Sequence, residues 1–161
     1  MTSSFKTFWI PLSVAGAVAS IMLVGITAAN AGECPADKVV AGDGQKAGPT
    51  AHKGVSEKLL GQIDLANEKI ALANHHLRMR RLEIAPGGEV AWHSHDDRPA
   101  LIYVISGTIS EYASTCSVPI VHKSGDLSIE SHLSHWWKNS SSKPVILISA
   151  DVATDVHDSN M

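Results

Sequence analysis

Apolar and polar residues alternate in short runs along most of this chain, and glycine, proline and serine separate the runs. A period of two residues indicates half-buried β-strands, and this many short strands in one chain predict a β-sandwich or a small barrel. A Pro-Gly-Gly turn is expected at 86–88. Only 55–73 has a helical period, which Gly61 and Ile63 weaken. The strand-like runs lie at 58–65, 76–88, 89–95, 100–107, 108–114, 118–125, 126–130, 134–139 and 144–152.

The N-terminal segment has the plan of a secretory signal peptide. Lys6 precedes an apolar run from about Phe8 to Ala29, and the run ends in the small-residue triplet Ala29-Asn30-Ala31. This pattern predicts cleavage after Ala31 and export to a periplasmic or extracellular compartment, with no stable membrane anchor afterwards. A transmembrane anchor is the alternative, because the run approaches the length that spans a bilayer.

The domain organisation follows from these patterns. We expect a signal peptide at 1–31, an extended N-terminal arm at 32–58, a single β-barrel domain at 59–154 and a C-terminal tail at 155–161. The chain of 161 residues is long enough for one compact domain. Its formal net charge is −3, and its one dense basic cluster is Arg78, Arg80 and Arg81, which argues against a nucleic-acid partner.

The chain contains two cysteines, Cys34 and Cys116. In an oxidising compartment two thiols of one small domain are expected to pair, and such a disulfide would attach the N-terminal arm to the domain. Two unpaired buried thiols are the alternative. Neither cysteine has a Cys or His neighbour at ligand spacing, so we do not expect them to bind a metal.

Three histidines are the candidate metal ligands. In "EVAWHSH", His93 and His95 share one face of a predicted strand and can reach the same ion. In "SHWWKN", His135 alternates with Trp137 and Asn139 onto one face of another strand. The interior of a barrel is where two such faces meet.

The spacing around these histidines resembles the motifs of the cupin superfamily. Gly87, His93, His95 and Gly107 match the first motif in every interval, but Ala100 stands where the family usually has a metal-binding glutamate. In the second motif Gly125, His135 and Asn139 match, whereas the usual proline and glycine are absent and the interval before His135 is one residue short.

The resemblance implies an all-β fold, a single cupin-type antiparallel β-barrel of the jelly-roll kind with a metal site inside. Three neutral imidazoles would hold a divalent transition metal (Fe, Mn, Zn, Ni or Cu) with its full +2 charge and leave open coordination positions. His132 and Glu111 are candidates for an additional ligand. Asp96 and Asp97 are weaker candidates, because they follow His95 at a corner.

Other residues are candidates for the lining of a substrate pocket. Trp137 could line it or pack in the core, Tyr103 could donate a hydrogen bond into it, and Arg78 and Arg80 could anchor a substrate carboxylate or pair with acids. Asn139 shares the His135 face.

Two functions from different classes remain open at the level of sequence. One is an exported metal-dependent enzyme, most simply an oxygenase-like enzyme on a small organic molecule. The other is a non-catalytic module that binds a small ligand or a metal, since no general base or nucleophile lies beside the histidines. A homodimer is an open alternative for the oligomeric state, because small cupins often pair through their sheets.

Overall fold

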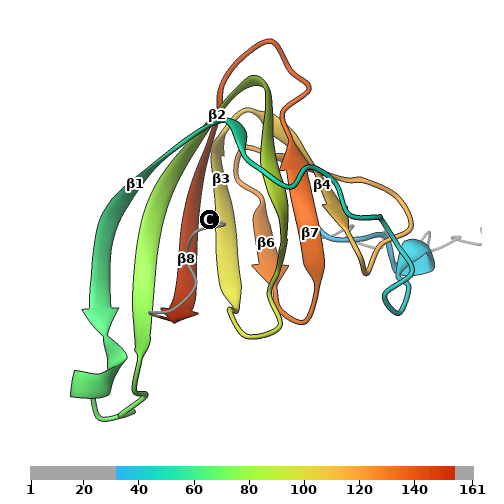
Figure 1. Ribbon diagram of the computed structural model, residues 1–161. Helices are drawn as coiled ribbons and strands as arrows, with labels where there is room; N and C mark the ends of the chain where they lie inside the picture. Colours follow the sequence, from blue (N-terminus) through green and yellow to red (C-terminus); the bar gives the residue numbers. More distant parts are fainter. Residues whose placement is uncertain (1–31, 155–161) are drawn as a thin grey trace, which may run out of the picture.

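The computed structural model describes residues 32–154, and they form one curved antiparallel sheet that nearly closes into a barrel (Figure 1). No α-helix occurs within this range; the helical elements there are two 3-10 turns, η1 (Ala36–Lys38) and η2 (Leu65–Asn67). The predicted all-β fold is therefore confirmed. The strands are β1 (Lys53–Asp64), β2 (His75–Ser94), β3 (Ala100–Ser106), β4 (Thr108–Ala113), β5 (Ile120–Lys123), β6 (Leu127–Glu130), β7 (Ser134–Lys138) and β8 (Val145–Thr154).

Strand β2 organises the sheet, because its two halves have different partners. Its first half lies between β1 and β8, and its second half pairs with β7. The order across the sheet is β5-β4-β7-β2-β8-β3-β6. Strand β1 pairs with the edge of β2 opposite β8. The long β2 thereby joins the two parts of the barrel wall.

The prediction of a turn at 86–88 is wrong, because β2 continues through these residues as a bent strand. Gly87 has a φ of +72°, a conformation that favours glycine. Its N–H donates to the Asn139 carbonyl, and the Asn139 N–H donates to the Gly88 carbonyl. These two bonds keep the chain paired across the bend, so that residues 89–94 continue as a strand beside β7.

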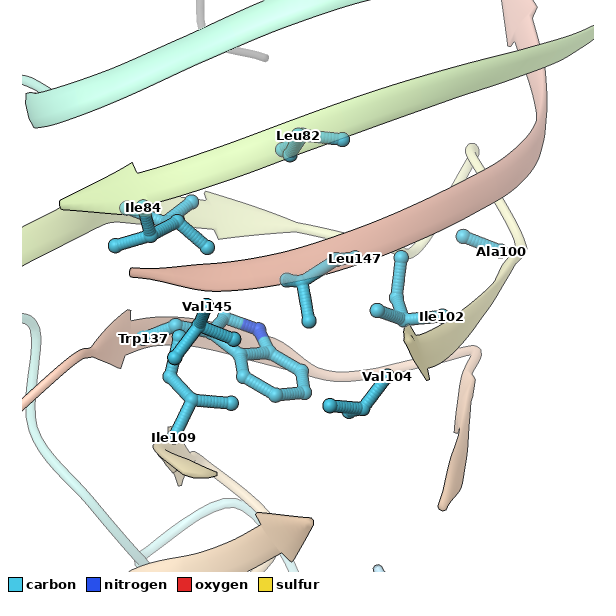
Figure 2. Close-up of a cluster of buried hydrophobic side chains, with 10 residues drawn as sticks. Leu82, Ile84, Ala100, Ile102, Val104, Ile109, Trp137, Val145 and Leu147 are labelled. Carbon is cyan, nitrogen blue, oxygen red and sulfur yellow. The ribbon is translucent and has the colours of Figure 1, made fainter. Parts of the chain in front are cut away.

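The hydrophobic core fills one part of the barrel (Figure 2). Trp137 lies at its centre, and the alternating inward residues of β2, β3 and β8 surround it. Burial of these side chains is the main favourable contribution to folding. The members of the cluster are Leu82, Ile84, Val90, Ala100, Ile102, Val104, Ile109, Trp137, Val145 and Leu147.

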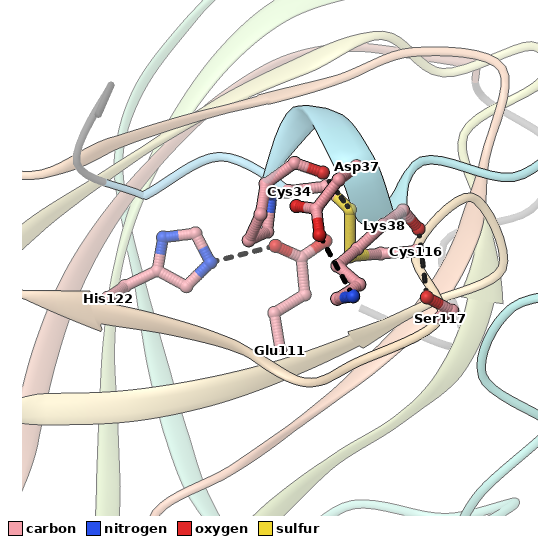
Figure 3. The surroundings of a disulfide bond; sticks show 8 residues. Cys34, Asp37, Lys38, Glu111, Cys116, Ser117 and His122 are labelled. Atoms are coloured by element: carbon pink, nitrogen blue, oxygen red, sulfur yellow. Dashed lines mark hydrogen bonds and ion pairs between the residues drawn. A yellow bond between two sulfur atoms is a disulfide. The ribbon is translucent and has the colours of Figure 1, made fainter. Parts of the chain in front are cut away.

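The N-terminal arm is attached covalently to the barrel. Cys34 and Cys116 form the expected disulfide, with their α-carbons 5.7 Å apart (Figure 3). Backbone hydrogen bonds continue the attachment, from Val40 N–H to the Thr115 carbonyl and from Trp92 N–H to the Pro49 carbonyl. Closing a loop of 82 residues is worth roughly 4 kcal/mol in the chain-entropy account.

The segments expected near the chain ends compare with the structure as follows. Strand β1 begins at Lys53, inside the segment 32–58 that the pattern assigns to the arm, because its alternating residues pair along β2. The signal peptide and the C-terminal tail lie outside the described residues. Within 32–154, no helix is long and apolar enough to cross a membrane.

A buried cluster of charges lies beside the apolar core. Asp151 accepts two hydrogen bonds from Arg78, from Nε at 3.0 Å and from Nη2 at 2.6 Å. It also accepts one from Arg80 Nη2 at 2.9 Å, and Arg80 Nη1 donates to Glu57 at 3.0 Å. Carboxylates of the chain itself therefore bind both guanidinium groups that the sequence offers as anchors for a substrate.

Replacing Asp151 with asparagine is expected to destabilise the fold by roughly 3–5 kcal/mol, because two arginine charges lose their shared buried partner. Urea unfolding at pH 7 measures the loss. Glu83→Gln is the matched control: it removes an exposed partner of Arg81 and should cost less than about 1 kcal/mol. Equal effects of the two substitutions would contradict a structural role for the Asp151 cluster.

The same pair of proteins tests the pH dependence. Burial would raise the pKa of Asp151, but the hydrogen bond from Arg78 and the charge of Arg80 outweigh it and hold the pKa below its ordinary 3.8. A depressed carboxyl pKa gives stability that is present above the ordinary pKa and lost as the pH falls through the folded value. The stability difference between wild type and Asp151→Asn should therefore be constant above about pH 5 and shrink in acid.

Candidate metal centre

Pairing between β2 and β7 brings the three candidate histidines together. His93 lies directly opposite His135 in the register of the two strands, and His95 follows on β2. The Nε2 atom of His93 is 3.0 Å from Nε2 of His95 and 3.1 Å from Nε2 of His135. All three rings are buried. The structure therefore places three imidazole nitrogens around one point inside the barrel.

A fourth group, Glu130, completes the cluster. It ends strand β6, it is 1% exposed, and its Oε2 lies 3.0 Å from His95 Nε2 and 3.6 Å from His135 Nε2. The candidate ligand atoms of His93, His95, Glu130 and His135 all lie within 4.8 Å of one another. Three nitrogens and one carboxylate oxygen at this spacing suit a divalent transition metal.

The outward nitrogen of each ring has an acceptor, which determines the tautomer. The Nδ1 atoms of His93 and His95 lie 2.8 Å and 2.6 Å from the backbone carbonyls of Ala91 and Arg98. His135 Nδ1 lies 2.6 Å from Oε1 of Glu111. A ring that donates through Nδ1 has a lone pair on Nε2, and this is how metal-binding histidines are usually oriented.

Burial keeps two of these rings neutral. It lowers the pKa of His93 to about 2, with a contribution from the nearby His135, and lowers the pKa of His95 to about 4. Neutral imidazole is the form that binds a metal. The rings are therefore ready to act as ligands without first losing a proton at neutral pH.

Glu130 is in an unfavourable environment in the absence of a cation. Neither of its carboxyl oxygens has a hydrogen-bond partner among residues 32–154. Burial, with a smaller contribution from the charge of Glu111, raises its pKa to about 8. Its Oε2 faces the lone pair of His95 Nε2, which is unfavourable unless a proton or a metal ion lies between them. A divalent cation would satisfy these atoms, so the residues fit a metal.

Glu130 lies on the strand next to Ala100, the position where the cupin motif usually has a glutamate. In the pairing of β3 with β6, Ala100 lies directly opposite Glu130. The carboxylate has thus moved one strand across while it remains at the same end of the barrel. This finding corrects the expectation that the protein ligands leave the metal with its full +2 charge. An ionised Glu130 would reduce the net charge of the metal and its ligands to +1.

Glu130 was missed in the sequence because the pattern of β6 predicts the opposite orientation. In "LSIE" the apolar residues Leu127 and Ile129 would be expected to face the core. Both are exposed, and the polar residues Ser128 and Glu130 are buried instead. The one available signal was the empty motif position at Ala100, which required a carboxylate from elsewhere. Only the register of β3 with β6 identifies which one.

The two residues considered as additional ligands lie elsewhere. Glu111 accepts hydrogen bonds from His135 Nδ1 and from His122 Nε2, so it supports a ligand instead of pointing into the cluster. His132 is exposed, has a φ of +55°, and lies in the turn between β6 and β7. Neither residue belongs to the group of four around the candidate metal position.

The candidate pocket residues are placed as follows. Trp137 is buried in the core, 5.7 Å from the His135 ring and 4.5 Å from the His122 ring between centroids. Asn139 is buried and its amide donates to the carbonyls of Ile84, Ala85 and Lys143, which braces the bend of β2. Tyr103 is 43% exposed on the outer face of β3.

The space beside the cluster is small. A cavity of about 10 Å³ adjoins His93 and Glu130, and Leu82, Ile102, Trp137 and Ser149 are among its lining residues. A cavity of this size holds at most one water molecule. The space that directly adjoins His93 and Glu130 therefore admits a water-sized ligand and no larger one.

Comparison with known proteins identifies the barrel. Residues 80–151 match the family model of the cupin domain. This match, together with the fold, confirms the resemblance to the cupin superfamily over residues 80–151, which run from β2 to β8. No curated protein sequence matches the chain.

Solved structures share the fold at low identity. A predicted oxalate decarboxylase from Thermotoga maritima is 15% identical over 74% of this chain and 97% of that chain, with a TM-score of 0.51. An uncharacterized conserved protein with a double-stranded β-helix domain from Klebsiella pneumoniae subsp. pneumoniae is 18% identical over 75% and 88% of the two chains, with a TM-score of 0.50. At this identity the likeness shows the fold alone.

Glu130→Gln tests the new member of the cluster. The amide keeps the size of the side chain but cannot ionise, so Zn²⁺ or Mn²⁺ affinity should fall by at least the roughly 10–100-fold that loss of an outer-shell partner costs. Metal-free protein should be no less stable than wild type, because the buried carboxyl has no hydrogen-bond partner among the described residues. Titration with each metal and urea unfolding measure the two effects.

Glu89→Gln is the control for this substitution. Glu89 pairs with the half-exposed Lys138 and lies outside the cluster, so its replacement should leave metal affinity unchanged. Unchanged affinity in Glu130→Gln would contradict the assignment of Glu130 as a ligand.

Proposed function

We propose that this protein is an exported cupin that binds one divalent transition metal through His93, His95, Glu130 and His135. The observation that carries the proposal is the convergence, inside the barrel, of three Nε2 atoms and a carboxylate that has no hydrogen-bond partner within residues 32–154. The Cys34–Cys116 disulfide is compatible with export, since disulfides persist in oxidising compartments. The ligand set of three imidazoles and one carboxylate indicates a transition metal (Fe, Mn, Zn, Ni or Cu) and does not select one of them.

The site supports small-molecule chemistry at the metal. In a five- or six-coordinate geometry four protein ligands would leave one or two open positions, and a bound metal would supply Lewis acidity or oxygen activation there. The buried histidines and the apolar residues around them would exclude bulk water, while the Nδ1 partners hold the rings in place. An oxygenase-like enzyme is the catalytic form of the proposal, and the open positions would accept a small substrate.

The size of the cavity favours a second candidate function. A space of about 10 Å³ admits water or a comparably small ligand, which suits a module that binds a metal or a small ligand without converting it. A screen of metal-loaded protein with small organic acids and dioxygen separates the two. Tight binding without turnover would favour the module, and product formation would favour the enzyme.

Metal content is the direct test of the site. Protein purified from the exported fraction should carry about one transition-metal ion per chain by elemental analysis, and His93→Ala should lose it. His132→Ala, which changes an exposed histidine outside the cluster, should retain the metal. A wild-type protein that neither carries nor binds a metal would refute the proposed function.

A second copy of this chain is the proposed partner of the outer sheet face. Met79, Ala150, Leu101 and Ile129 lie in one row across β2, β8, β3 and β6. Three of these four side chains are 46–61% exposed. An apolar face this extended indicates an interaction surface. Because Arg81 and Glu83 place both signs of charge on β2 beside it, the face can complement its own copy about a two-fold axis.

Light scattering tests the dimer. The wild type should have the mass of two chains, and Ile129→Lys should shift it to one, because Ile129 is the most exposed apolar residue of the row and a charge there is costly to bury. Val39→Lys, which changes an exposed apolar residue in the arm, should remain dimeric. A monomeric wild type would contradict this partner.

A further inference from the structure

A second hydrogen-bonded chain leads away from the candidate metal centre. Oε1 of Glu111 accepts the Nδ1 proton of His135, and its Oε2 accepts the Nε2 proton of His122 at 2.8 Å (Figure 3). His122 is 0% exposed. In the neutral tautomer whose Nε2 donates to Glu111, His122 Nδ1 carries a lone pair, and this atom has no hydrogen-bond partner among residues 32–154. The chain therefore ends in a buried acceptor that lacks a donor.

Gly32 lies against this acceptor. The residue is buried, with a φ of +91°, and a β-carbon built on it would lie 2.9 Å from His122 Nδ1. The same position is 3.2 Å from the carbonyl oxygen of Leu127, a second acceptor. The amino nitrogen of Gly32 is bonded to the same α-carbon, so a chain that begins there can turn its amine toward either acceptor.

The surroundings form a cavity with a defined position for the chain. A space of about 140 Å³ is lined by Gly32, Glu33 and Cys34 of the arm and by Glu111 and Ser128 among others of the barrel. The disulfide to Cys116 holds the backbone two residues after Gly32. The position of Gly32 is therefore determined by a covalent bond and by contact with His122.

The charge balance also favours a cation at this place. The Glu111 carboxylate is buried, and both of its oxygens accept hydrogen bonds from ring nitrogens. An ammonium group that donates to His122 Nδ1 would place a positive charge one ring away from this buried negative charge.

We propose that the α-amino group of Gly32, freed by cleavage after Ala31, donates to His122 Nδ1 and completes a chain from the N-terminus through Glu111 to His135. The proposal rests on the expected cleavage site, and its effect on metal rests on the proposed function. A peptide N–H at Gly32 has one donor and no charge, whereas a free amine has three donors and a charge. Cleavage would thus supply the missing donor. Gly32 and His122 act as positioning residues for His135.

The test uses the full chain, expressed with its own leader and purified from the exported fraction. Sequencing should place the mature N-terminus at Gly32. A variant with one serine inserted between Ala31 and Gly32 moves the amine one residue away from His122. The amine of the wild type should react with an acylating reagent about 10-fold or more slowly than that of the insertion variant, as expected for a charge-assisted hydrogen bond.

Two further measurements distinguish this proposal from the proposed function. The ¹⁵N shift of His122 Nδ1 in metal-free protein should differ between wild type and the insertion variant, whether or not the protein binds a metal. Metal affinity should fall by about 10-fold in the variant, in the range of outer-shell partners. If the wild type binds no metal but its ¹⁵N shift differs from that of the insertion variant, the proposed function is overturned and the proposal about the Gly32 amine stands.

A substitution pair controls for folding and backbone strain. Gly32→Ala introduces a β-carbon 2.9 Å from His122 Nδ1, whereas Gly42→Ala introduces one at a φ of +89° with nothing within 4 Å. Gly42→Ala controls for the loss of a glycine in the same arm, and the first residue of a cleaved chain carries no φ penalty, so only Gly32→Ala should reproduce the faster acylation and the shift of Nδ1. An N-terminus other than Gly32, or equal acylation rates and equal shifts in wild type and the insertion variant, would overturn the proposal.

Discussion

The pairing of the second half of β2 with β7 is the contact on which the rest of the site depends. It places His93 opposite His135 and, through the bend at Gly87, brings both strands to the same part of the barrel wall. Without the hydrogen bonds between Asn139 and residues 87–88 the bend would have no partner, and the two histidine strands would lose their register. The metal cluster is therefore a consequence of one strand that changes partners without ending.

The polar interior of this barrel is costly to the fold and is organised to limit that cost. Asp151 accepts hydrogen bonds from two arginines, and Glu111 accepts hydrogen bonds from the rings of His122 and His135. These interactions lower the pKa of both carboxyl groups, so both remain ionised. Glu130 has no such partner among the described residues, and its pKa rises to about 8. A small domain would gain stability from an apolar residue at that position, so the retention of a buried acid there is best explained by a cation.

Much of the fold was readable from the sequence, because it depends on local pattern. The alternation of apolar residues predicted the strands, and the spacing of Gly87, His93, His95 and Gly107 pointed to a cupin barrel. Two cysteines in a chain with a predicted export signal predicted the disulfide. The prediction failed at Pro86–Gly88, where turn residues form a bend inside a strand, since the partners that hold the bend lie far away at Asn139.

The sequence by itself determined the strand content, the pair of cysteines and the three histidines of the cluster, because these follow from residue type and short spacing. Only the tertiary structure decided the fourth member, since Glu130 reaches the cluster through the register of β6 with β3, against its own apolar pattern. It also decided that Glu111 supports His135 and that Gly32 lies beside His122. These contacts join residues far apart in the chain, and no local pattern encodes a distance between two strands.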